Sequence, residues 1–258
     1  MDTRSDRTTQ VARALVGARR SHGLVEAAPL LTALSNADTA YATQDLVAQE
    51  LGWFDRAAPR HWKSGGPSRD AVLTHAPLPP SGVWPSPADA RAWPFRLRGI
   101  EAEIALRLAR DVDPALAQQL DSAQATALVD AMCVSIEIVD SRWAEGLAAP
   151  ALAKLADLQS HGALVLGAWV PFAPRDWGAQ VCRVQIGTQP PTEHRGSHAL
   201  ADPAFVLPAW LRHATRGGRR LAAGTVVTTG TWVGILHAAA GDLVAADFSG
   251  IGHASVQL

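Results

Sequence analysis

Three glutamates in the sequence could share one metal ion. Glu101 and Glu103 lie two residues apart, and the two-residue period of a β-strand places both carboxylates on one face. Apolar residues alternate with them, so residues 99–108 are predicted to form a strand with one apolar side and one acidic side. Glu137 lies in a second short run rich in β-branched residues. Three carboxylates with no His or Cys among them suit Mg²⁺ or Mn²⁺ better than Zn²⁺.

The Glu-x-Glu pattern has a second interpretation. Two acids on an amphipathic strand are commonly a solvent-exposed face that binds nothing. The surroundings of Glu137 favour the metal, because the sequence on both sides of it is apolar and an unpaired carboxylate is costly to bury.

The composition limits the class of protein. The chain has 258 residues, is 48% hydrophobic, and carries a formal net charge of −1 from 23 Lys and Arg against 24 Asp and Glu. These values favour a globular protein with one large domain, or a domain and a small lobe. Without an excess of basic residues, nothing indicates a nucleic-acid partner. Cys133 and Cys182 both lie in apolar segments, which predicts buried free thiols and a reducing compartment.

We expect a cytoplasmic protein without a membrane partner. The longest apolar run, residues 163–172, is much shorter than the roughly 20 residues that a membrane helix requires. The first residues also lack the apolar segment of a signal peptide.

The order of predicted elements indicates an α+β fold. Two helices open the chain, the first ending near Gly23 and the second capped by Asp38. The proline-rich residues 76–95 exclude regular helix and mark a boundary between an N-terminal helical lobe (1–75) and a catalytic β-roll domain (76–258), packed as one globule. Further helices are predicted near residues 122–133 and from 202 to 217, the latter delayed or kinked by Pro208. Strands are predicted at 99–108, around Glu137, and at 162–170, 181–187, 226–229, 243–248 and 253–257, which favours a curled mixed sheet.

Six short motifs follow one another in an informative order. They are Ala40-Tyr41-x-x-Gln44, Trp62-Lys63-x-Gly65, Glu101-Ala-Glu103-Ile-Ala, Glu137-Ile-Val-Asp-Ser-Arg142, Arg195-Gly-Ser197 and Thr229-Gly230-Thr231. In order and approximate spacing, residues 36–258 resemble the 2-keto-4-pentenoate hydratase branch of the fumarylacetoacetate hydrolase superfamily. That branch also contains 2-oxohepta-3-ene-1,7-dioate hydratases and 4-oxalocrotonate decarboxylases.

The resemblance implies a mixed β-roll with an N-terminal helical segment and a divalent metal, Mg²⁺ or Mn²⁺, held by Glu101, Glu103 and Glu137. It also implies a homo-oligomer. Members hydrate a 2-hydroxy-2,4-dienoate to a 4-hydroxy-2-oxo acid, or decarboxylate a related 2-oxo dioate, during meta-cleavage of aromatic compounds. The expected substrate is therefore a small 2-oxo or 2-hydroxydienoic acid, which chelates a metal through a carboxylate oxygen and the 2-oxygen.

The resemblance also implies roles for other residues. Lys63 would stabilise negative charge on the carboxylate or enol oxygen of the substrate, or donate a proton. Its pKa would be lowered by the cation and by burial. Without the resemblance, a surface lysine beside a glycine turn is the preferred interpretation. Thr229, Gly230 and Thr231 would bind the substrate carboxylate, or else form an ordinary turn after a strand.

Two serines are further candidates for substrate binding. Ser160 occupies a position where the family has a small polar residue near the site, and a turn serine is the competing explanation. Ser68 ends the loop Ser64-Gly-Gly-Pro-Ser68, which departs from the Gly-Leu-Thr sequence that typically follows the family lysine.

A second departure removes an acid. The family sequence Pro-Asp-Phe-Gly, whose Asp is a candidate for proton transfer, is replaced by Pro79-Pro80-Ser81-Gly82. Either His61, His75, His161 or water would then move the proton, or the reaction differs from hydration of the simple dienoate.

Three functions are consistent with these motifs. A metal-dependent hydratase leads, and a metal-dependent 2-oxo dioate decarboxylase of the same family is the second. The altered lysine loop and the missing acid also allow a catalytically altered subunit that pairs with an active relative. A C–C hydrolase ranks lower, because no His-carboxylate pair that would activate a nucleophile is tied to the metal motif.

Overall fold

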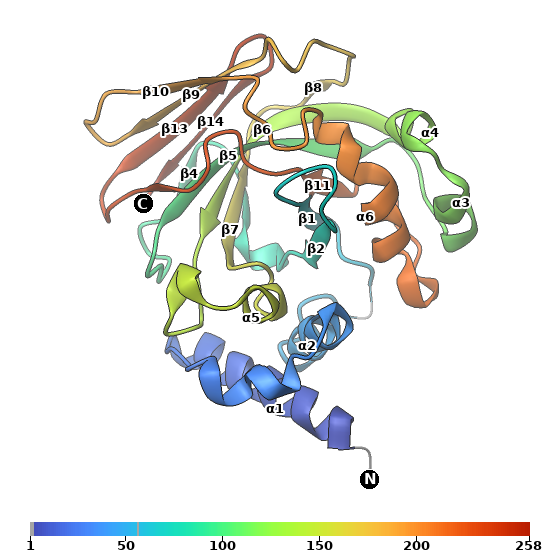
Figure 1. The fold of residues 1–258 in the computed structure, drawn as a ribbon. Helices are drawn as coiled ribbons and strands as arrows, with labels where there is room; N and C mark the ends of the chain where they lie inside the picture. The colour runs from blue at the N-terminus through green and yellow to red at the C-terminus, as the bar shows by residue number, and fades with distance from the viewer. Residues whose placement is uncertain (1–2, 56) are drawn as a thin grey trace.

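The computed structural model describes residues 3–55 and 57–258. Two curled β-sheets pack together, and helices flank them on two sides (Figure 1). The fold is the predicted α+β roll with helices at its N-terminus.

A nine-stranded mixed sheet forms the centre. Its main path runs β2-β1-β11-β5-β6-β7-β3, with β12 paired to β5 and β8 paired to β6. Strand β1 runs parallel to β11, whereas β5 is antiparallel to both β11 and β6. The bounds are β1 His61–Gly65, β2 Thr74–Pro77, β3 Val83–Pro85, β5 Gly99–Leu108, β6 Val129–Val139, β7 His161–Leu166, β8 Val170–Pro171, β11 Val226–Thr228 and β12 Leu236–His237.

A five-stranded sheet covers one face of the central sheet. Its order is β10-β9-β13-β14-β4, and β14 packs against β6 and β7. The bounds are β4 Ala88–Asp89, β9 Val181–Ile186, β10 Thr192–Arg195, β13 Leu243–Phe248 and β14 Gly252–Gln257.

The helices form two groups. In Figure 1, α1, α2 and α5 lie together below the sheets, and α3, α4 and α6 lie beside them. The α-helices are α1 Thr3–Ser21, α2 Ala37–Glu50, α3 Pro114–Gln119, α4 Ser122–Thr126, α5 Ala151–Ala156 and α6 Leu207–Ala214, and the 3₁₀ helices are η1 Ala28–Ala33, η2 Pro80–Gly82, η3 Gly146–Ala148, η4 Pro203–Val206 and η5 Arg216–Gly218.

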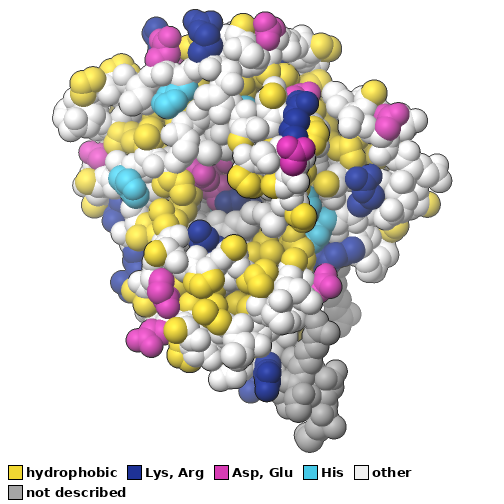
Figure 2. All heavy atoms as spheres, in the orientation of Figure 1, with side chains coloured by type: hydrophobic (Ala, Val, Ile, Leu, Met, Phe, Trp, Pro, Cys, Tyr) yellow, Lys and Arg dark blue, Asp and Glu magenta, His cyan; other side chains and the backbone are white. Residues whose placement is uncertain are grey.

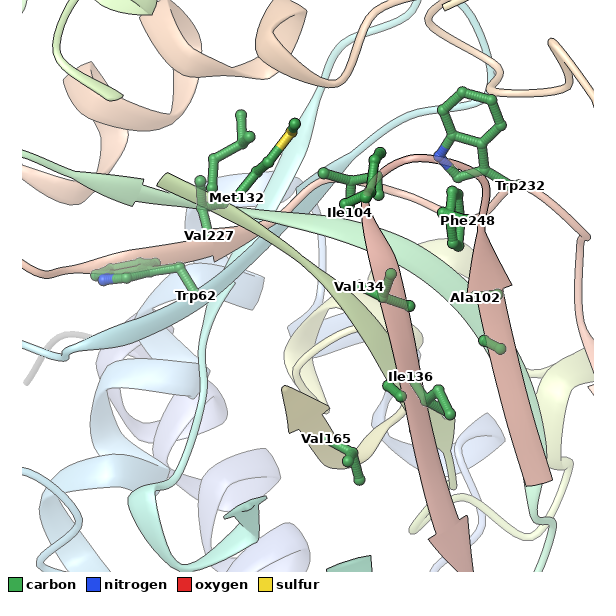
Figure 3. Close-up of a cluster of buried hydrophobic side chains, with 14 of the residues drawn as sticks. Trp62, Ala102, Ile104, Met132, Val134, Ile136, Val165, Val227, Trp232 and Phe248 are labelled. Atoms are coloured by element: carbon green, nitrogen blue, oxygen red, sulfur yellow. The ribbon is translucent and has the colours of Figure 1, made fainter. Parts of the chain in front are cut away.

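The main hydrophobic core uses one face of the β5–β6 ladder. Ala102 and Ile104 of β5 lie beside Val134 and Ile136 of β6, and Phe248 comes from the other sheet (Figure 3). All five side chains are buried. Because side chains alternate along a strand, the acidic residues between these positions point to the opposite face. The core therefore fixes the direction in which the glutamates point.

Several predicted elements agree with the structure, and others need correction. Strand β5 spans the predicted residues 99–108, and the helix after Asp202 begins as η4 before continuing as α6 at Leu207. The helix predicted near 122–133 is wrong beyond Thr126, because the β-branched run from Val129 extends β6 instead. The N-cap of α2 is Asn36, not Asp38, since its side chain accepts a hydrogen bond from the Thr39 N–H.

The central sheet takes strands from both sides of the predicted boundary at residues 75 and 76. Strand β1 precedes that boundary, yet it pairs with β11 near the end of the chain. The division into a lobe and a domain stays a prediction. Among the described residues, we find no helix with the length and apolar character needed to cross a membrane.

Candidate metal and acid–base site

Two neighbouring strands bring the three glutamates together. Glu101 of β5 lies directly opposite Glu137 of β6, and Glu103 lies opposite Ser135. One carboxylate oxygen from each glutamate lies within 4.8 Å of the others. Like charges that face each other across two strands repel. A positive charge between the three carboxylates would therefore stabilise this arrangement.

Glu103 is held in place by β11 and the turn that follows it. Its Oε2 accepts hydrogen bonds from the Thr228 hydroxyl and from the Gly230 N–H, the latter at 3.0 Å. Thr228 Oγ1 also lies 2.9 Å from Ser135 Oγ. Gly230 has a φ of +104°, in the region that favours glycine, so this residue lets the backbone turn its N–H toward the acid. These bonds fix one carboxylate before any ligand binds.

Glu137 connects the acidic cluster to two basic side chains. Its Oε1 lies 2.5 Å from Lys63 Nζ and 3.0 Å from His161 Nδ1. Its Oε2 is buried without a hydrogen-bond partner among the described residues. A buried carboxylate oxygen without a partner is costly, and a bound cation would satisfy it.

Burial and mutual repulsion shift the pKa of two carboxyls upward. Burial, together with the charges of Glu137 and Glu103, raises the pKa of Glu101 to about 8 even though Lys63 opposes the shift. Burial and Glu137 raise the pKa of Glu103 to about 7. The pKa of Glu137 is instead lowered, because Lys63 and His161 outweigh its burial. Without a metal, the site therefore disfavours the state in which all three carboxylates are ionised. A bound divalent cation would favour that state.

In the protein without metal the pKa of Lys63 is raised, whereas the predicted lowering included the effect of a bound cation. Burial alone would lower it, but the charges of Glu137, Glu101 and Glu103 outweigh burial and raise it. Lys63 therefore remains an ammonium at neutral pH and can donate a proton. Besides Glu137, its Nζ contacts the carbonyl oxygen of Gln159 at 3.3 Å.

His161 is a buried neutral imidazole. Burial lowers its pKa despite the hydrogen bond to Glu137, so the neutral form prevails. A carboxylate can only accept, so the Nδ1 that faces Glu137 carries the proton and Nε2 carries the lone pair. Nε2 is buried without a partner among the described residues. This ring can accept a proton at Nε2, and its contact with Glu137 corrects the expectation that no His-carboxylate pair is tied to the metal motif.

An unusual turn precedes His161. Leu158, Gln159 and Ser160 have consecutive positive φ values of 54°, 55° and 59°. Side chains disfavour this region, so three such residues in a row indicate a conformation imposed by the surrounding fold. The turn places the Gln159 carbonyl on Lys63 and leaves the buried Ser160 hydroxyl without a partner among the described residues.

These residues fit a divalent metal. The donor set consists of three carboxylates on rigid strands, and such hard oxygen ligands suit Mg²⁺ or Mn²⁺. Figure 2 shows a hollow near the centre of one face, between the sheets and the lower helices, with acidic and basic side chains inside it. A small ligand can approach such a hollow from solvent.

The structure corrects the prediction for Thr229. Its hydroxyl points away from the carboxylates and donates to the Ile104 carbonyl at 2.7 Å. The reason is strand alternation, which turns neighbouring residues to opposite faces, so Thr228 faces Glu103 instead. Thr231 lies in an exposed turn and donates to the Gly234 carbonyl, whereas Gly230 contributes its backbone N–H to the site.

Other predicted residues differ in how close they lie to the acids. Ser68 is half-buried in the loop after β1, where its carbonyl accepts the Ala71 N–H. His61 precedes Lys63 by two residues on β1, and its buried Nδ1 has no partner among the described residues. His75 does not face the carboxylates, because it pairs with Ser64 on the other face of β1 and its Nδ1 lies 2.9 Å from Ser64 Oγ.

Sequence reasoning missed Thr228, Ser135 and Gln159. Ser135 could have been identified from the sequence, because it lies two residues before Glu137 and therefore shares its face of the strand. Thr228 could be identified only from the pairing of β11 with β1 and β5. Gln159 contributes through its backbone carbonyl, which no side-chain pattern reveals.

Comparison with known proteins agrees with this architecture. Residues 72–258 match the model of the fumarylacetoacetate (FAA) hydrolase C-terminal family. The chain resembles 4-oxalocrotonate decarboxylase from Pseudomonas putida G7, solved with calcium and acetate, at 17% identity and a TM-score of 0.81, over 100% of this chain and 98% of that one. A structure of that enzyme with magnesium and adipate matches at 16% identity, a TM-score of 0.81 and the same coverage.

A second relative matches over less of the chain. It is 2-hydroxyhepta-2,4-diene-1,7-dioate isomerase from Mycobacterium marinum, with 16% identity and a TM-score of 0.55, over 78% of this chain and 74% of that one. At these identities the structures show a shared fold, whereas the family model covers well over half of the sequence. The chain belongs to the fumarylacetoacetate hydrolase family.

Proposed function

We propose that the protein is a metal-dependent lyase that hydrates a small 2-hydroxy-2,4-dienoic acid to a 4-hydroxy-2-oxo acid. The observation that carries the proposal is the meeting of three carboxylates, two of them buried and that of Glu101 half-buried, with one ammonium, from Lys63. Glu101, Glu103 and Glu137 would hold Mg²⁺ or Mn²⁺. When bound, the metal would polarise the carboxylate and 2-oxygen of the substrate.

The basic residues of the site supply the proton chemistry. Lys63 donates two hydrogen bonds to described residues, to Glu137 Oε1 and to the Gln159 carbonyl, and an ammonium has three donors. The third N–H can reach a substrate oxygen and steady negative charge as it develops there. Hydration adds a proton at C5 and a hydroxyl at C4, both from water, and the proton of the 2-hydroxyl moves to C3 as the enol becomes the 2-oxo acid, so an acid and a base must both act.

His161 is the base in this proposal. Its Nε2 has the free lone pair and can take a proton from the attacking water, while Nδ1 remains bonded to Glu137. Lys63 is the donor for the proton that reaches the carbon chain, directly or through the enol oxygen. Together they replace the acid that is absent at Pro80. Ser160, whose hydroxyl is buried and unpartnered among the described residues, would bind the substrate carboxylate, whereas the Gly230 N–H is already bonded to Glu103.

Decarboxylation of a 2-oxo dioate is the second candidate. The full-length similarity to 4-oxalocrotonate decarboxylase favours it, because the isomerase matches only 78% of this chain. The same metal site and Lys63 would serve this reaction, and His161 would then have no water to activate. The function of a partner subunit without activity remains the alternative if neither reaction occurs.

Product analysis separates the three candidates. The protein with Mg²⁺ or Mn²⁺ is incubated with 2-hydroxypenta-2,4-dienoate and, separately, with a 2-oxo-hexenedioate, and ultraviolet absorbance, released CO₂ and product mass are recorded. The proposal expects loss of dienoate absorbance with a mass gain of one water and no CO₂. Release of CO₂ from the dioate alone identifies a decarboxylase. Glu103→Gln is the control, and activity equal to wild type in that variant would overturn the proposal.

A further inference from the structure

A second cavity lies beside the end of the central sheet. It has a volume of about 310 Å³, which is in the range of small-ligand sites. Four arginines line it, namely Arg19 and Arg20 from the end of α1, Arg96 from the loop before β5, and Arg142 after β6. Trp53 and Trp93 provide aromatic walls.

Two of the arginines share one carboxylate. Arg19 Nη2 lies 2.8 Å from Asp157 Oδ1, and Arg142 Nη2 lies 2.8 Å from Asp157 Oδ2. Asp157 is fully buried, so its single charge balances only one of the two guanidinium groups. Arg19 Nε is buried without a partner among the described residues. Burial, and after it the nearby Arg142, lowers the pKa of Arg19 to about 10, although Asp157 opposes the shift.

The other two arginines have no acidic partner among the described residues. Arg20 donates to the Glu50 carbonyl and Arg96 to the His22 carbonyl. Asp140 is the acid among the described lining residues, and it accepts the backbone N–H groups of Arg96 and Leu97. Two carboxylates accompany the four guanidinium groups, Asp140 in the lining and Asp157 paired with Arg19 and Arg142, which leaves an excess of two positive charges.

We infer that this cavity binds a small dianion with carboxylate or phosphate groups. Guanidinium groups form paired hydrogen bonds with the oxygens of both groups, and two negative charges match the excess. A volume of about 310 Å³ suits a molecule the size of a short dicarboxylate or of inorganic phosphate with water.

The cavity is separate from the carboxylate cluster. Its lining includes none of Glu101, Glu103, Glu137 and Lys63. The two sites are connected through strands, because Asp140 follows β6, which carries Glu137, and Gly162 directly follows His161 on β7. An anion in this cavity would therefore contact the ends of both strands that carry the Glu137–His161 pair.

Calorimetric titration tests this inference. Inorganic phosphate and succinate are titrated separately into chelator-treated protein at constant ionic strength. Three variants are compared with wild type: Arg20→Gln, the double variant Arg20→Gln with Arg96→Gln, and Arg183→Gln. Arg183 is an exposed arginine on β9 that pairs with Glu193, so it is a matched control. Arg20 is exposed, so its replacement keeps the fold and serves even if the double variant is unstable.

We expect at least one probe to bind wild-type protein, with about tenfold weaker affinity in Arg20→Gln and unchanged affinity in Arg183→Gln, since a charge-assisted hydrogen bond contributes about 1.5 kcal/mol or more. The probe that binds more tightly identifies the source of the dianion. Failure of both probes to bind wild type would overturn the inference. Binding that survives Arg20→Gln but disappears in Lys63→Met would also overturn it, because the probe would then occupy the carboxylate site.

Discussion

The ammonium of Lys63 lies 2.5 Å from Glu137 Oε1, although 74 residues separate them in the sequence. The contact joins β1 to β6, and the Lys63 side chain is only 12% exposed. In this position the lysine both neutralises part of the acidic cluster and competes for a carboxylate oxygen that a metal would use.

Replacement of Lys63 should separate turnover from metal binding. We expect Lys63→Met to lower kcat by roughly 10²-fold, the usual scale for loss of a positioned acid or electrostatic group. Affinity for Mn²⁺ should stay equal or rise, because Glu137 Oε1 is released. Steady-state kinetics and Mn²⁺ titration measure the two effects. Lys154→Met is the control, since the chain has only these two lysines. A kcat near wild type would mean that Lys63 is structural.

His161 can be tested by two substitutions that differ in one interaction. His161→Asn keeps a polar group near Glu137 but removes the Nε2 lone pair, whereas His161→Ala removes both. We expect both variants to lose about 10²-fold in kcat, the scale of lost base catalysis, with metal affinity preserved better in His161→Asn. Full activity of the Asn variant would assign the base role to another group, with His61 next on the same strand as Lys63.

Thr228 should affect the metal without touching it. Thr228→Val keeps the shape but removes the hydroxyl that donates to Glu103. Loss of a hydrogen bond that orients a ligand typically weakens metal binding about tenfold or more. Thr231→Val is the matched control, because its hydroxyl bonds to the Gly234 carbonyl in an exposed turn. Equal affinities in the two variants would show that the hydroxyl does not orient Glu103.

The strand positions of the acids were predictable, whereas their partners were not. A period of two in residues 99–108 gave the face of Glu101 and Glu103, because local sequence determines alternation. Neighbouring residues of a strand point to opposite faces, so the prediction of Thr229 in place of Thr228 was wrong by one residue and therefore selected the wrong face. The contacts of Lys63 depended on the parallel pairing of β1 with β11, which no local pattern specifies.

His75 predicts a pH dependence of stability outside the metal site. Burial lowers its pKa to about 3 in the folded protein, whereas an unfolded histidine titrates near about 6.5. Below about pH 6.5 the unfolded state binds one more proton than the folded state. The free energy of unfolding therefore falls as the pH falls, by about 1.4 kcal/mol per pH unit. This loss continues until the folded pKa is reached.

Denaturant unfolding between about pH 7 and pH 5 measures this slope. His75→Gln should reduce the slope by one proton, whereas His253→Gln, an exposed histidine on β14, should leave it unchanged. An unchanged slope in His75→Gln would contradict the assignment of a neutral buried ring.

The most direct test of the central claim is Mn²⁺ binding to chelator-treated protein, followed by electron paramagnetic resonance. We predict one bound ion per chain in wild type, loss of at least tenfold in affinity for Glu103→Gln and for Glu137→Gln, and no change for Glu193→Gln, an exposed acid on β10. A wild-type protein that binds no Mn²⁺, or Glu103→Gln and Glu137→Gln variants that bind it as tightly as wild type, would contradict a metal site at the three glutamates.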